Sequence, residues 1–376
     1  MHGYGKINIL TLSNYWLKGN PFFMKIAVLV SGGVDSSVAL ALLKQQGYDV
    51  TAFYLKIWLE DELSHLGDCP WEEDLSYARA VCEKLQVPLE IISFQQQYSD
   101  IVVAYTLAEV RAGRTPNPDI LCNQYIKFGA FYQAISDDYA YVATGHYAQV
   151  EHTNDVSYLK KAVDPVKDQT YFLSYLSQAQ LKRALFPIGH LPKSHVRALA
   201  HEFGLPTSTR KDSQGICFLG KFKFKEFLQA HLGTKPGEIK EFETGVKLGM
   251  HSGFWYYTIG QRQGIKLSGG PWYVVSKDIE RNIIFVSRQY QEVEEHKHGM
   301  IATNFNWISG MSHSSELEVR FRHGPVLHLA KVAVQENGKV KIMLHEEVLQ
   351  GIACGQFAVL YEKDICLGGG VIEQAL

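Results

Sequence analysis

Long apolar runs are missing from this 376-residue chain: no stretch approaches the roughly 18–20 residues that a membrane-spanning helix needs, so no membrane association is expected. A strong charge of either sign is also missing. The net charge of −2 argues against a generally basic nucleic-acid binder, although it leaves room for a local basic face. With 46% hydrophobic and 20% charged residues, the composition is that of a globular protein, and the length predicts two or three domains.

Cysteine is scarce, with six residues and none in a CxxC pair, so no structural zinc site is expected and no metal ligands are assigned. No secretory leader is recognisable, which favours a reducing cytoplasm with free thiols. Residues 1–23 lack acidic side chains but contain no Arg and only one Ser, a poor match to a transit peptide. We expect a cytoplasmic location, and an organellar one stays open.

One local excess of positive charge lies between Lys182 and Lys225, where nine Lys or Arg residues accompany only two acids, Glu202 and Asp212. Such a run is often a solvated helical surface. It is also suited to holding the phosphates of a nucleic acid, contacts that fix register without reading sequence. The run alone does not decide between these two interpretations.

The pattern of residues along the chain changes after about Lys225. From Lys25 to about Tyr147, short β-rich runs alternate with helical periodicity, which predicts an α/β domain with a parallel sheet covered on both faces. After about Lys225 glycine is frequent and strands are short, so the last third is expected to form a small antiparallel β-barrel. We predict an N-terminal extension (1–23), a catalytic domain (24–224), a small β-rich central domain (225–292) and a barrel domain (293–376).

Two hairpins are expected in the last third. Leu329–Val334 and Val340–Leu344 alternate in polarity around Asn337-Gly338, a pair that favours a type I′ turn with positive φ at both positions. A second hairpin should join Phe357–Tyr361 to Ile365–Ile372.

A phosphate-binding loop is the strongest local motif. The predicted strand Lys25–Val30 runs into Ser31-Gly32-Gly33-Val34-Asp35-Ser36-Ser37 and then a helix. Two glycines allow the backbone to turn tightly and present N–H groups to an anion, and the helix N-terminus favours negative charge. No Gly-Lys-Ser/Thr follows, so this is not a Walker loop. A carboxylate at Asp35 cannot attract phosphate, which indicates a Mg²⁺ ligand or a helix cap.

SGGVDSS resembles the signature of the PP-loop ATP pyrophosphatases, enzymes that cleave ATP between its α- and β-phosphates and transfer AMP. The resemblance implies ATP as cosubstrate, with Mg²⁺ bound transiently beside it. It leaves the acceptor open, because the same family includes synthetases that activate small carboxylates or keto groups. A non-catalytic RNA-binding protein that has kept the loop is a further alternative.

Two cysteines lie in distinctive segments. In GRTPNPDILCN (113–123), two prolines predict a rigid loop that holds Asp119 and Cys122 in a fixed relation. If Asn123 onward is helical, Cys122 lies at a helix N-terminus, where a thiolate is stabilised. Alternatively, Asp119 is a helix cap and Cys122 a small apolar residue.

Cys217 follows Arg210 and Lys211 in the segment RKDSQGICF (210–218). Nearby positive charge lowers a thiol pKa, which suits a sulfur carrier. The alternative is a buried cysteine beside a basic turn. Cys82, by contrast, recurs with apolar neighbours at helical spacing and is expected in the core, as are Cys354 and Cys366 in predicted strands.

Taken together, the motifs resemble one branch of the PP-loop family, the tRNA-specific 2-thiouridylases (MnmA in bacteria, TrmU in mitochondria). The matching stretches include SGGVDSS, GRTPNPDILCN, ATGHYA, KDQTYFL, FPIGHLPKSHVR, DSQGICFLGK, GFWYYTIGQRQGI and GQFAVLYEKDICLGGG, and the resemblance covers about 24–373. It implies a Rossmann-like PP-loop domain followed by a central domain and a C-terminal β-barrel. Where many relatives have Met-Lys-Asn-Trp, this chain has Leu55-Lys56-Ile57-Trp58, which loses an amide at Ile57. Cys69 is assigned no chemistry.

The resemblance also implies a mechanism. The C2 oxygen of wobble uridine 34 is adenylated, and sulfur then arrives from a persulfide on Cys217, with Cys122 as partner thiol and Asp119 as acid or base, giving 2-thiouridine, AMP and pyrophosphate. ATP contacts are implied for Leu29, Val30, Ser31, Gly32, Gly33, Val34, Asp35, Ser36, Leu55 and Gly145. tRNA contacts are implied for Asn117, Pro118, Asp119, His146, Lys167, Asp168, Gln169, Arg320, Phe321 and Gln356. The implied partners are the Lys, Glu and Gln tRNAs and a persulfide donor, such as a cysteine desulfurase or a sulfur-relay protein.

Overall fold

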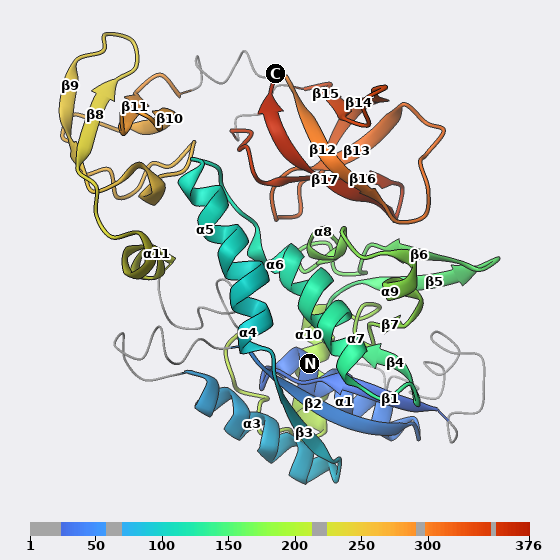
Figure 1. The fold of residues 1–376 in the computed structure, drawn as a ribbon. Coiled ribbons are helices and arrows are strands. Elements are labelled where there is room, and N and C mark those ends of the chain that lie inside the picture. The colour runs from blue at the N-terminus through green and yellow to red at the C-terminus, as the bar shows by residue number, and fades with distance from the viewer. Residues whose placement is uncertain (1–23, 58–69, 213–223, 291–297, 347–350) are drawn as a thin grey trace, which may run out of the picture.

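The N-terminal part of the chain is built on a five-stranded parallel sheet. The computed structural model describes residues 24–57, 70–212, 224–290, 298–346 and 351–376, and it orders these strands β3-β2-β1-β4-β7 (Figure 1). Their bounds are β1 Lys25–Leu29, β2 Asp49–Lys56, β3 Leu89–Ser93, β4 Tyr139–Ala143 and β7 Ala184–Leu185. All four neighbouring pairs are parallel, which confirms the α/β prediction.

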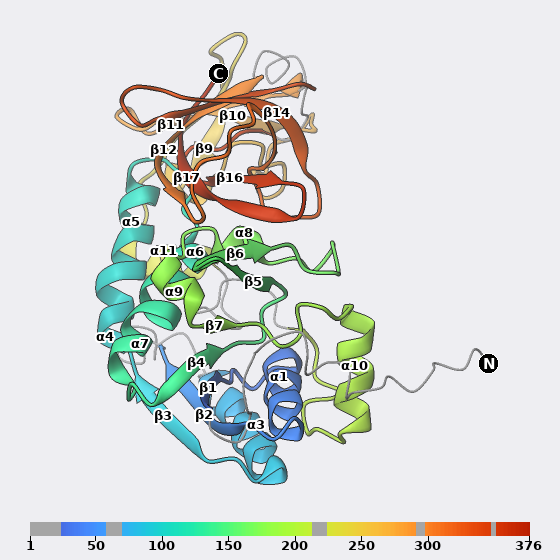
Figure 2. The same cartoon turned by 90° about the vertical axis from the view of Figure 1, so that its right-hand side faces the viewer.

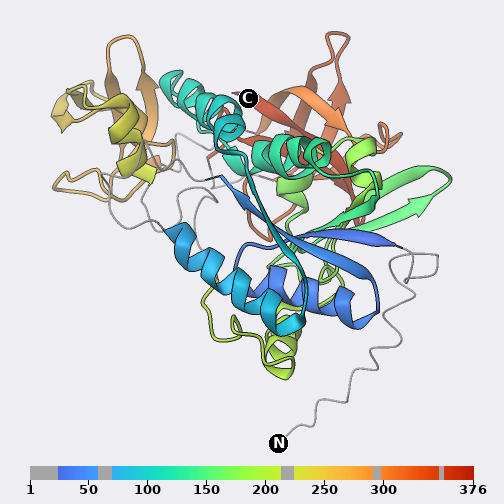
Figure 3. The same ribbon diagram turned by 60° about the horizontal axis from the view of Figure 1, so that its bottom comes forward.

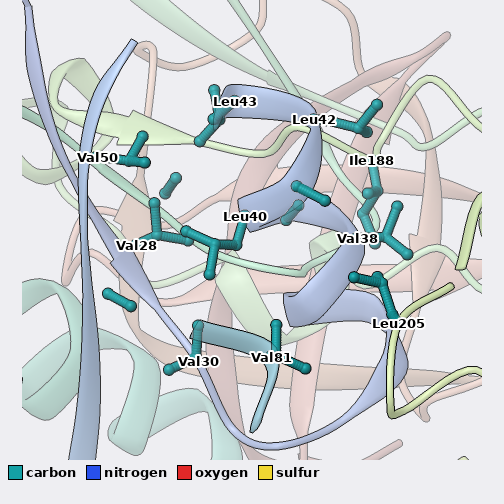
Figure 4. Close-up of a cluster of buried hydrophobic side chains, with 14 of the residues drawn as sticks. Val28, Val30, Val38, Leu40, Leu42, Leu43, Val50, Val81, Ile188 and Leu205 are labelled. Carbon is teal, nitrogen blue, oxygen red and sulfur yellow. The ribbon is translucent and has the colours of Figure 1, made fainter. Parts of the chain in front are cut away.

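Strand β1 shows why this sheet is covered on both faces. Successive side chains of a strand point to opposite faces. Ile26 and Val28 accordingly join one hydrophobic cluster, while Ala27 and Leu29 join another. The first cluster, part of which is drawn in Figure 4, packs α1 Val34–Gln45, α3 Pro70–Leu85 and α10 Lys193–Glu202 against the sheet. Cys82 lies in it, 3% exposed, and burial raises the pKa of its thiol to about 11, so its predicted core position is confirmed.

The opposite face of the sheet is covered by a long run of helix (Figure 3). Its segments are α4 Gln95–Tyr98, a π-helix Ser99–Val103, α5 Ala104–Arg111, α6 Pro118–Leu121, a second π-helix Cys122–Ala130 and α7 Phe131–Ala134. Helix α11, Phe224–Leu232, packs on the same cluster through Phe227 and Leu228. Within the described residues, no helix is both long and apolar enough to cross a membrane.

A small mixed sheet follows, with its own core. Its strands lie in the order β10-β11-β8-β9. Their bounds are β8 Gly237–Glu241, β9 Lys247–His251, β10 Tyr273–Asp278 and β11 Ile283–Ser287. A 3-10 turn, Phe254–Tyr256, contributes Phe254 to a separate cluster with Ile239, Trp272 and Val274.

The C-terminal third is a closed antiparallel barrel, as predicted (Figure 2). Its strands are β12 Gly299–Trp307, β13 Glu316–Arg320, β14 His328–Val334, β15 Val340–Leu344, β16 Phe357–Glu362 and β17 Ile365–Ala375. Pairing of β12 with both β15 and β17 closes the ring. Both expected hairpins are present. The prediction of a type I′ turn is wrong, however, because φ is positive at Gly338 (+76°) but not at Asn337. The Gln335 N–H donates to the Lys339 carbonyl at 2.8 Å, which makes a longer loop.

One hairpin of the N-terminal part belongs to the barrel sheet. Strands β5 Gln149–Thr153 and β6 Val156–Lys160 pair with each other, and β6 pairs with β17 through Lys160 and Leu159. Two short helices, α8 Thr170–Leu173 and α9 Gln178–Lys182, lie beside this hairpin (Figure 1). The sequence did not predict this pairing, which joins the two parts of the molecule across more than 200 residues of chain.

Candidate active site

The Ser31–Ser37 loop leaves the end of β1 and enters α1 without a side-chain cap. Gly33 is the N-cap residue, and it provides no side-chain cap for the first N–H groups of the helix. The hydroxyls of Ser37 and Ser36 donate to the Gly33 carbonyl, at 2.7 and 3.2 Å, and the Ser31 N–H donates to Ser36 Oγ at 3.2 Å. This arrangement keeps the loop tight and leaves the N–H groups at the start of α1 for an anion.

Glycine is required at position 32. Its φ is +73°, and a Cβ there would lie 2.2 Å from the carbonyl oxygen of Asp74 in α3. Arg210 closes the same corner, since its guanidinium donates to the Gly32 carbonyl at 2.6 Å and pairs with the Asp74 carboxylate. The loop is therefore fixed from outside by α3 and by the segment after α10.

Gly145 brings the neighbouring strand against this loop. A Cβ on Gly145, just beyond β4, would lie 2.6 Å from the backbone nitrogen of Ser36. The crevice between β1 and β4 is where the strand order reverses, and open α/β sheets bind ligands at the carboxyl ends of such strands. Leu55, near the end of β2, is half-buried at the same edge. The predicted nucleotide residues thus come from adjacent strand ends, and their backbone donors and small side chains fit a triphosphate.

Asp35 is not a helix cap. Its carboxylate is bound by Lys193 Nζ at 2.7 and 2.9 Å and accepts a hydrogen bond from the Tyr147 hydroxyl at 2.8 Å. The helix-cap role predicted for Asp35 is therefore wrong, and the role of a Mg²⁺ ligand stays a prediction. Lys193 would have to leave the carboxylate, at least in part, for a metal ion to bind there.

Lys193 also bonds Asp212, at 2.9 Å, and Lys167 and Arg197 contact the same carboxylate. Burial by itself would raise the pKa of Asp212, but hydrogen bonds from Lys193 and Lys167 outweigh it and hold that pKa well below its usual value. The basic run between Lys182 and Lys225 is therefore only partly a surface feature: three of its cations, Lys193, Arg197 and Arg210, are paired with carboxylates at this site.

The segment bearing Asp119 and Cys122 is helical earlier than expected. Asn117 is the N-cap of α6 and Pro118 its first residue, so Asp119 lies in the first turn and Cys122 beyond it, where the π-helix starts. The prediction of a helix N-terminus at Cys122 is wrong, because the helix already starts at Pro118. The helix dipole acts mainly within the first turn, so it provides little stabilisation for a thiolate at Cys122. Cys122 is 1% exposed and belongs to the same hydrophobic cluster as Leu29 of β1.

Cys217 and Cys69 lie outside the described residues, so the convergence of Cys217 with Cys122 stays a prediction. Asp212, the last described residue before that gap, is held by the cations around the phosphate loop. Cys366 is buried in β17 as expected, while Cys354 is half-buried in a turn rather than a strand.

Several residues predicted to contact tRNA contact other parts of the protein. Asp168 and Arg320 form an ion pair of 2.7 Å with side chains only 1% and 3% exposed, and Phe321 is 2% exposed. The Gln169 side chain accepts from the Tyr147 N–H at 2.9 Å. The described structure therefore gives Asp168 and Arg320 a role in joining the barrel to the N-terminal part, since neither reaches the surface.

His146 follows Gly145 and packs against Phe128 and Phe186. Its Nδ1 lies 2.7 Å from the Thr144 hydroxyl. Burial, with help from the Lys127 charge, lowers the pKa of His146 well below 6.5, so the imidazole is neutral at physiological pH. A neutral ring can donate or accept a hydrogen bond to a base without adding charge.

Sequence reasoning missed Lys193 and His323. A cation in the first turn of a helix opposes the dipole, and that signal in PKSHVR could have identified Lys193. His323, just beyond β13, packs at a tilt on Phe172, with ring centres 4.6 Å apart. Burial and the Arg320 charge lower the pKa of His323, and the Asp119 carboxylate opposes them, which puts a barrel residue within electrostatic reach of Asp119. No local pattern could have indicated this pairing.

Comparison with known proteins gives consistent matches along the whole chain. Family models match residues 24–221 (tRNA methyl transferase HUP domain), 225–288 (tRNA methyl transferase PRC-barrel domain) and 297–372 (aminomethyltransferase beta-barrel domain). A solved NMN synthetase from Francisella tularensis superposes on 58% of this chain and 79% of its own, at 17% identity and a TM-score of 0.37, too low to support a conclusion.

Curated relatives are much closer. A tRNA-specific 2-thiouridylase MnmA from Parabacteroides distasonis is 45% identical over 356 residues, covering 93% of this chain and 99% of its own. Those from Porphyromonas gingivalis and Bacteroides fragilis are each 44% identical, with 93% of this chain and at least 99% of theirs covered. At this identity and coverage, the chain belongs to the tRNA-specific 2-thiouridylase (MnmA) family of PP-loop enzymes.

Proposed function

We propose that this protein is an ATP-dependent tRNA sulfurtransferase that converts wobble uridine 34 to 2-thiouridine. The observation that carries the proposal is the uncapped Ser31–Ser37 loop at the β1–β4 crevice, in a chain whose relatives are named for this activity. The π-helix that begins at Cys122 packs on the same sheet, in the hydrophobic cluster that contains Leu29. An adenylating site and a thiol thus share one sheet.

The first step activates a poor leaving group. The uridine C2 oxygen attacks the α-phosphorus of ATP, an oxygen–phosphorus bond forms, and the bond to pyrophosphate breaks. The N–H groups at the start of α1 stabilise the charge on the departing phosphates, in a loop whose shape is held by the Ser36 and Ser37 hydroxyls. Asp35 is the carboxylate that would hold Mg²⁺ with the ATP, and Lys193, released from it, would neutralise phosphate charge.

The second step forms the carbon–sulfur bond. The outer sulfur of a Cys217 persulfide attacks C2, and AMP leaves with the former uridine oxygen. The Cys122 thiolate then attacks Cys217 Sγ, breaking the sulfur–sulfur bond, so that the sulfur stays on the base and a Cys122–Cys217 disulfide forms. If Cys122 attacks first, hydrosulfide is released and performs the attack on C2 instead. Either order ends in the same disulfide, which an external dithiol must reduce.

Asp119 is the proposed acid or base at the uridine, since it lies in the first turn of α6 three residues before Cys122. A base in an anticodon loop is already single-stranded, so moving it into the site costs less than extrusion from a duplex. We propose the Lys, Glu and Gln tRNAs as acceptors, and a cysteine desulfurase or sulfur-relay protein as persulfide donor. The reaction is proposed to take place in the cytoplasm.

Nucleoside mass spectrometry of tRNA incubated with the protein, ATP, Mg²⁺ and a persulfide source tests the proposal directly. We expect 2-thiouridine that depends on ATP, with AMP and pyrophosphate formed in equal amounts. Absence of 2-thiouridine from the wild-type reaction, with pyrophosphate exchange stimulated by a small carboxylate instead of tRNA, would favour a synthetase and refute the proposal.

Cys217→Ser separates the carrier from the adenylating site. We expect it to abolish 2-thiouridine while RNA binding and pyrophosphate release persist, because it removes the carrier atom and no basic surface. A normal rate of thiolation in this variant would show that another group carries the sulfur.

A further inference from the structure

The loop between α5 and α6, residues 112–117, leads directly into the helix that carries Asp119 and Cys122. Helix α5 ends between the central sheet and the barrel (Figure 1). A shift of this α5–α6 loop would move Asp119, two residues beyond it. The contacts that hold this loop therefore influence the positions of Asp119 and Cys122.

The N-terminal domain holds the first part of this loop through contacts with the end of α5. The Gly113 N–H donates to the Val110 carbonyl at 3.0 Å and the Arg114 N–H to the Glu109 carbonyl at 2.9 Å, a helix C-terminal pattern. The Arg114 guanidinium forks onto the Glu109 carboxylate, at 2.7 and 2.5 Å. The carbonyl groups of residues 113, 115 and 116 are bound by side chains from elsewhere in the chain.

The central domain binds the loop through β10. Lys277 Nζ donates to the Gly113 carbonyl at 3.0 Å. Ile279 packs so closely that a Cβ on Gly113 would lie 2.6 Å from its Cδ1. Burial lowers the pKa of Lys277 to about 8, which shows how far this ammonium is withdrawn from water to make the contact.

The barrel binds the loop from the other side, through the turn before β16. The Thr115 N–H donates to the Cys354 carbonyl at 2.9 Å, and Gln356 Nε2 donates to the carbonyls of Thr115 and Pro116 at 3.1 and 2.9 Å. Between them, Gly355 has a φ of +90°, and a Cβ there would lie 2.8 Å from the Thr115 carbonyl oxygen. Only glycine permits this approach.

We propose that Lys277, Gly355 and Gln356 are positioning residues, through which the two β domains together set the geometry of the Asp119–Cys122 helix. The inference rests on the proposed function in one respect: the rate that these three residues influence is the rate of 2-thiouridine formation. Gln356 orients the loop rather than only contacting RNA, because its amide nitrogen donates to the loop carbonyls of Thr115 and Pro116.

Gly355→Ala and Lys277→Met test the proposal in the full-length protein. We expect kcat for 2-thiouridine formation to fall about tenfold or more while KM for tRNA changes less than about twofold, since misplacement lowers the rate of the bound complex. Gly310→Ala is the matched control for Gly355→Ala: it has a φ of +94° and nothing within 4 Å of an added Cβ. Lys235→Met, an exposed lysine near the central sheet, is the control for Lys277→Met.

A rise in KM alone would mean that these residues bind RNA directly and would overturn the proposal, as would an unchanged kcat in both variants. Amide hydrogen exchange at Thr115 provides a readout without activity. We expect faster exchange in Gly355→Ala than in Gly310→Ala, together with faster maleimide labelling of the buried Cys122. Equal exchange in the two alanine variants would refute the positioning role. If wild-type protein made no 2-thiouridine, the proposed function would fail while the exchange comparison still decided the role of the loop.

Discussion

The phosphate loop and the α5–α6 loop are held by different parts of the chain. The phosphate loop is closed by hydrogen bonds among Ser31, Gly33, Ser36 and Ser37, and Asp74 and Arg210 fix it from outside, all within the first domain. The α5–α6 loop depends on Lys277 and Gln356, which lie more than 160 residues away in the sequence. The comparison teaches that the phosphate loop is held within the first domain, whereas the loop that leads to Asp119 and Cys122 is contacted by all three parts of the chain.

Breaking the buried ion pair between the barrel and the N-terminal part should have the largest effect. Arg320→Met leaves the Asp168 carboxylate buried without its cation, and we expect the free energy of unfolding to fall by about 3–5 kcal/mol. Urea unfolding followed by tryptophan fluorescence measures this loss. Adding Asp168→Leu should recover part of it, and a double variant less stable than Arg320→Met would contradict the explanation.

Gly32→Ala should distort the phosphate loop and weaken ATP use. An added Cβ meets the Asp74 carbonyl at 2.2 Å and the φ of +73° disfavours alanine, so we expect kcat/KM for ATP to fall about 100-fold. Pyrophosphate release measures this loss. Gly33→Ala is the matched control, because its Cβ would meet only Ser31 Oγ at 3.3 Å and its φ is −88°. Similar losses in the two variants would mean that the contact with α3 is unimportant.

Lys193→Met tests the charge network beside the phosphate loop. Removing the ammonium leaves Asp35 and Asp212 with less compensation beside the phosphate loop, and we expect pyrophosphate release to slow about tenfold. Lys193→Arg keeps the charge and should restore most of the rate. An unchanged rate in Lys193→Met would show that Lys193 is not used once ATP is bound.

Acid should weaken the N-terminal domain through His190. Burial lowers the pKa of His190 from 6.5 to about 4, so between these values the unfolded chain binds the proton and the folded chain does not. Stability should therefore decrease as pH falls from 6.5 to about 4, by about 1–2 kcal/mol from this group. Urea midpoints measured over that range should fall less steeply in His190→Gln; parallel curves would exclude the contribution.

The difference between the two loops also explains what the sequence could predict. The parallel sheet, the phosphate loop and both barrel hairpins follow from local alternation and turn residues, and all are present. The turn at Asn337 was predicted wrongly because two loop lengths accept the same Asn-Gly pair. Local pattern is a sound guide where the contacts themselves are local.

The rest could not be predicted, for the same reason. Asp168 and Arg320 were expected at an RNA surface, but 152 residues of sequence separate the two members of this buried pair. The contacts of Lys277 with Gly113, and of His323 with Phe172, likewise depend on how the domains are assembled. No periodicity or spacing in the sequence encodes that assembly.

The β5–β6 hairpin has a consequence for synthesis on the ribosome. Strand β6 finds its second partner only when β17, the last strand of the chain, has been made. Until then its outer edge offers unpaired N–H and C=O groups that a neighbouring nascent chain could capture. A chain stalled before residue 365 would therefore leave this edge of β6 unpaired and open to aggregation until β17 is made.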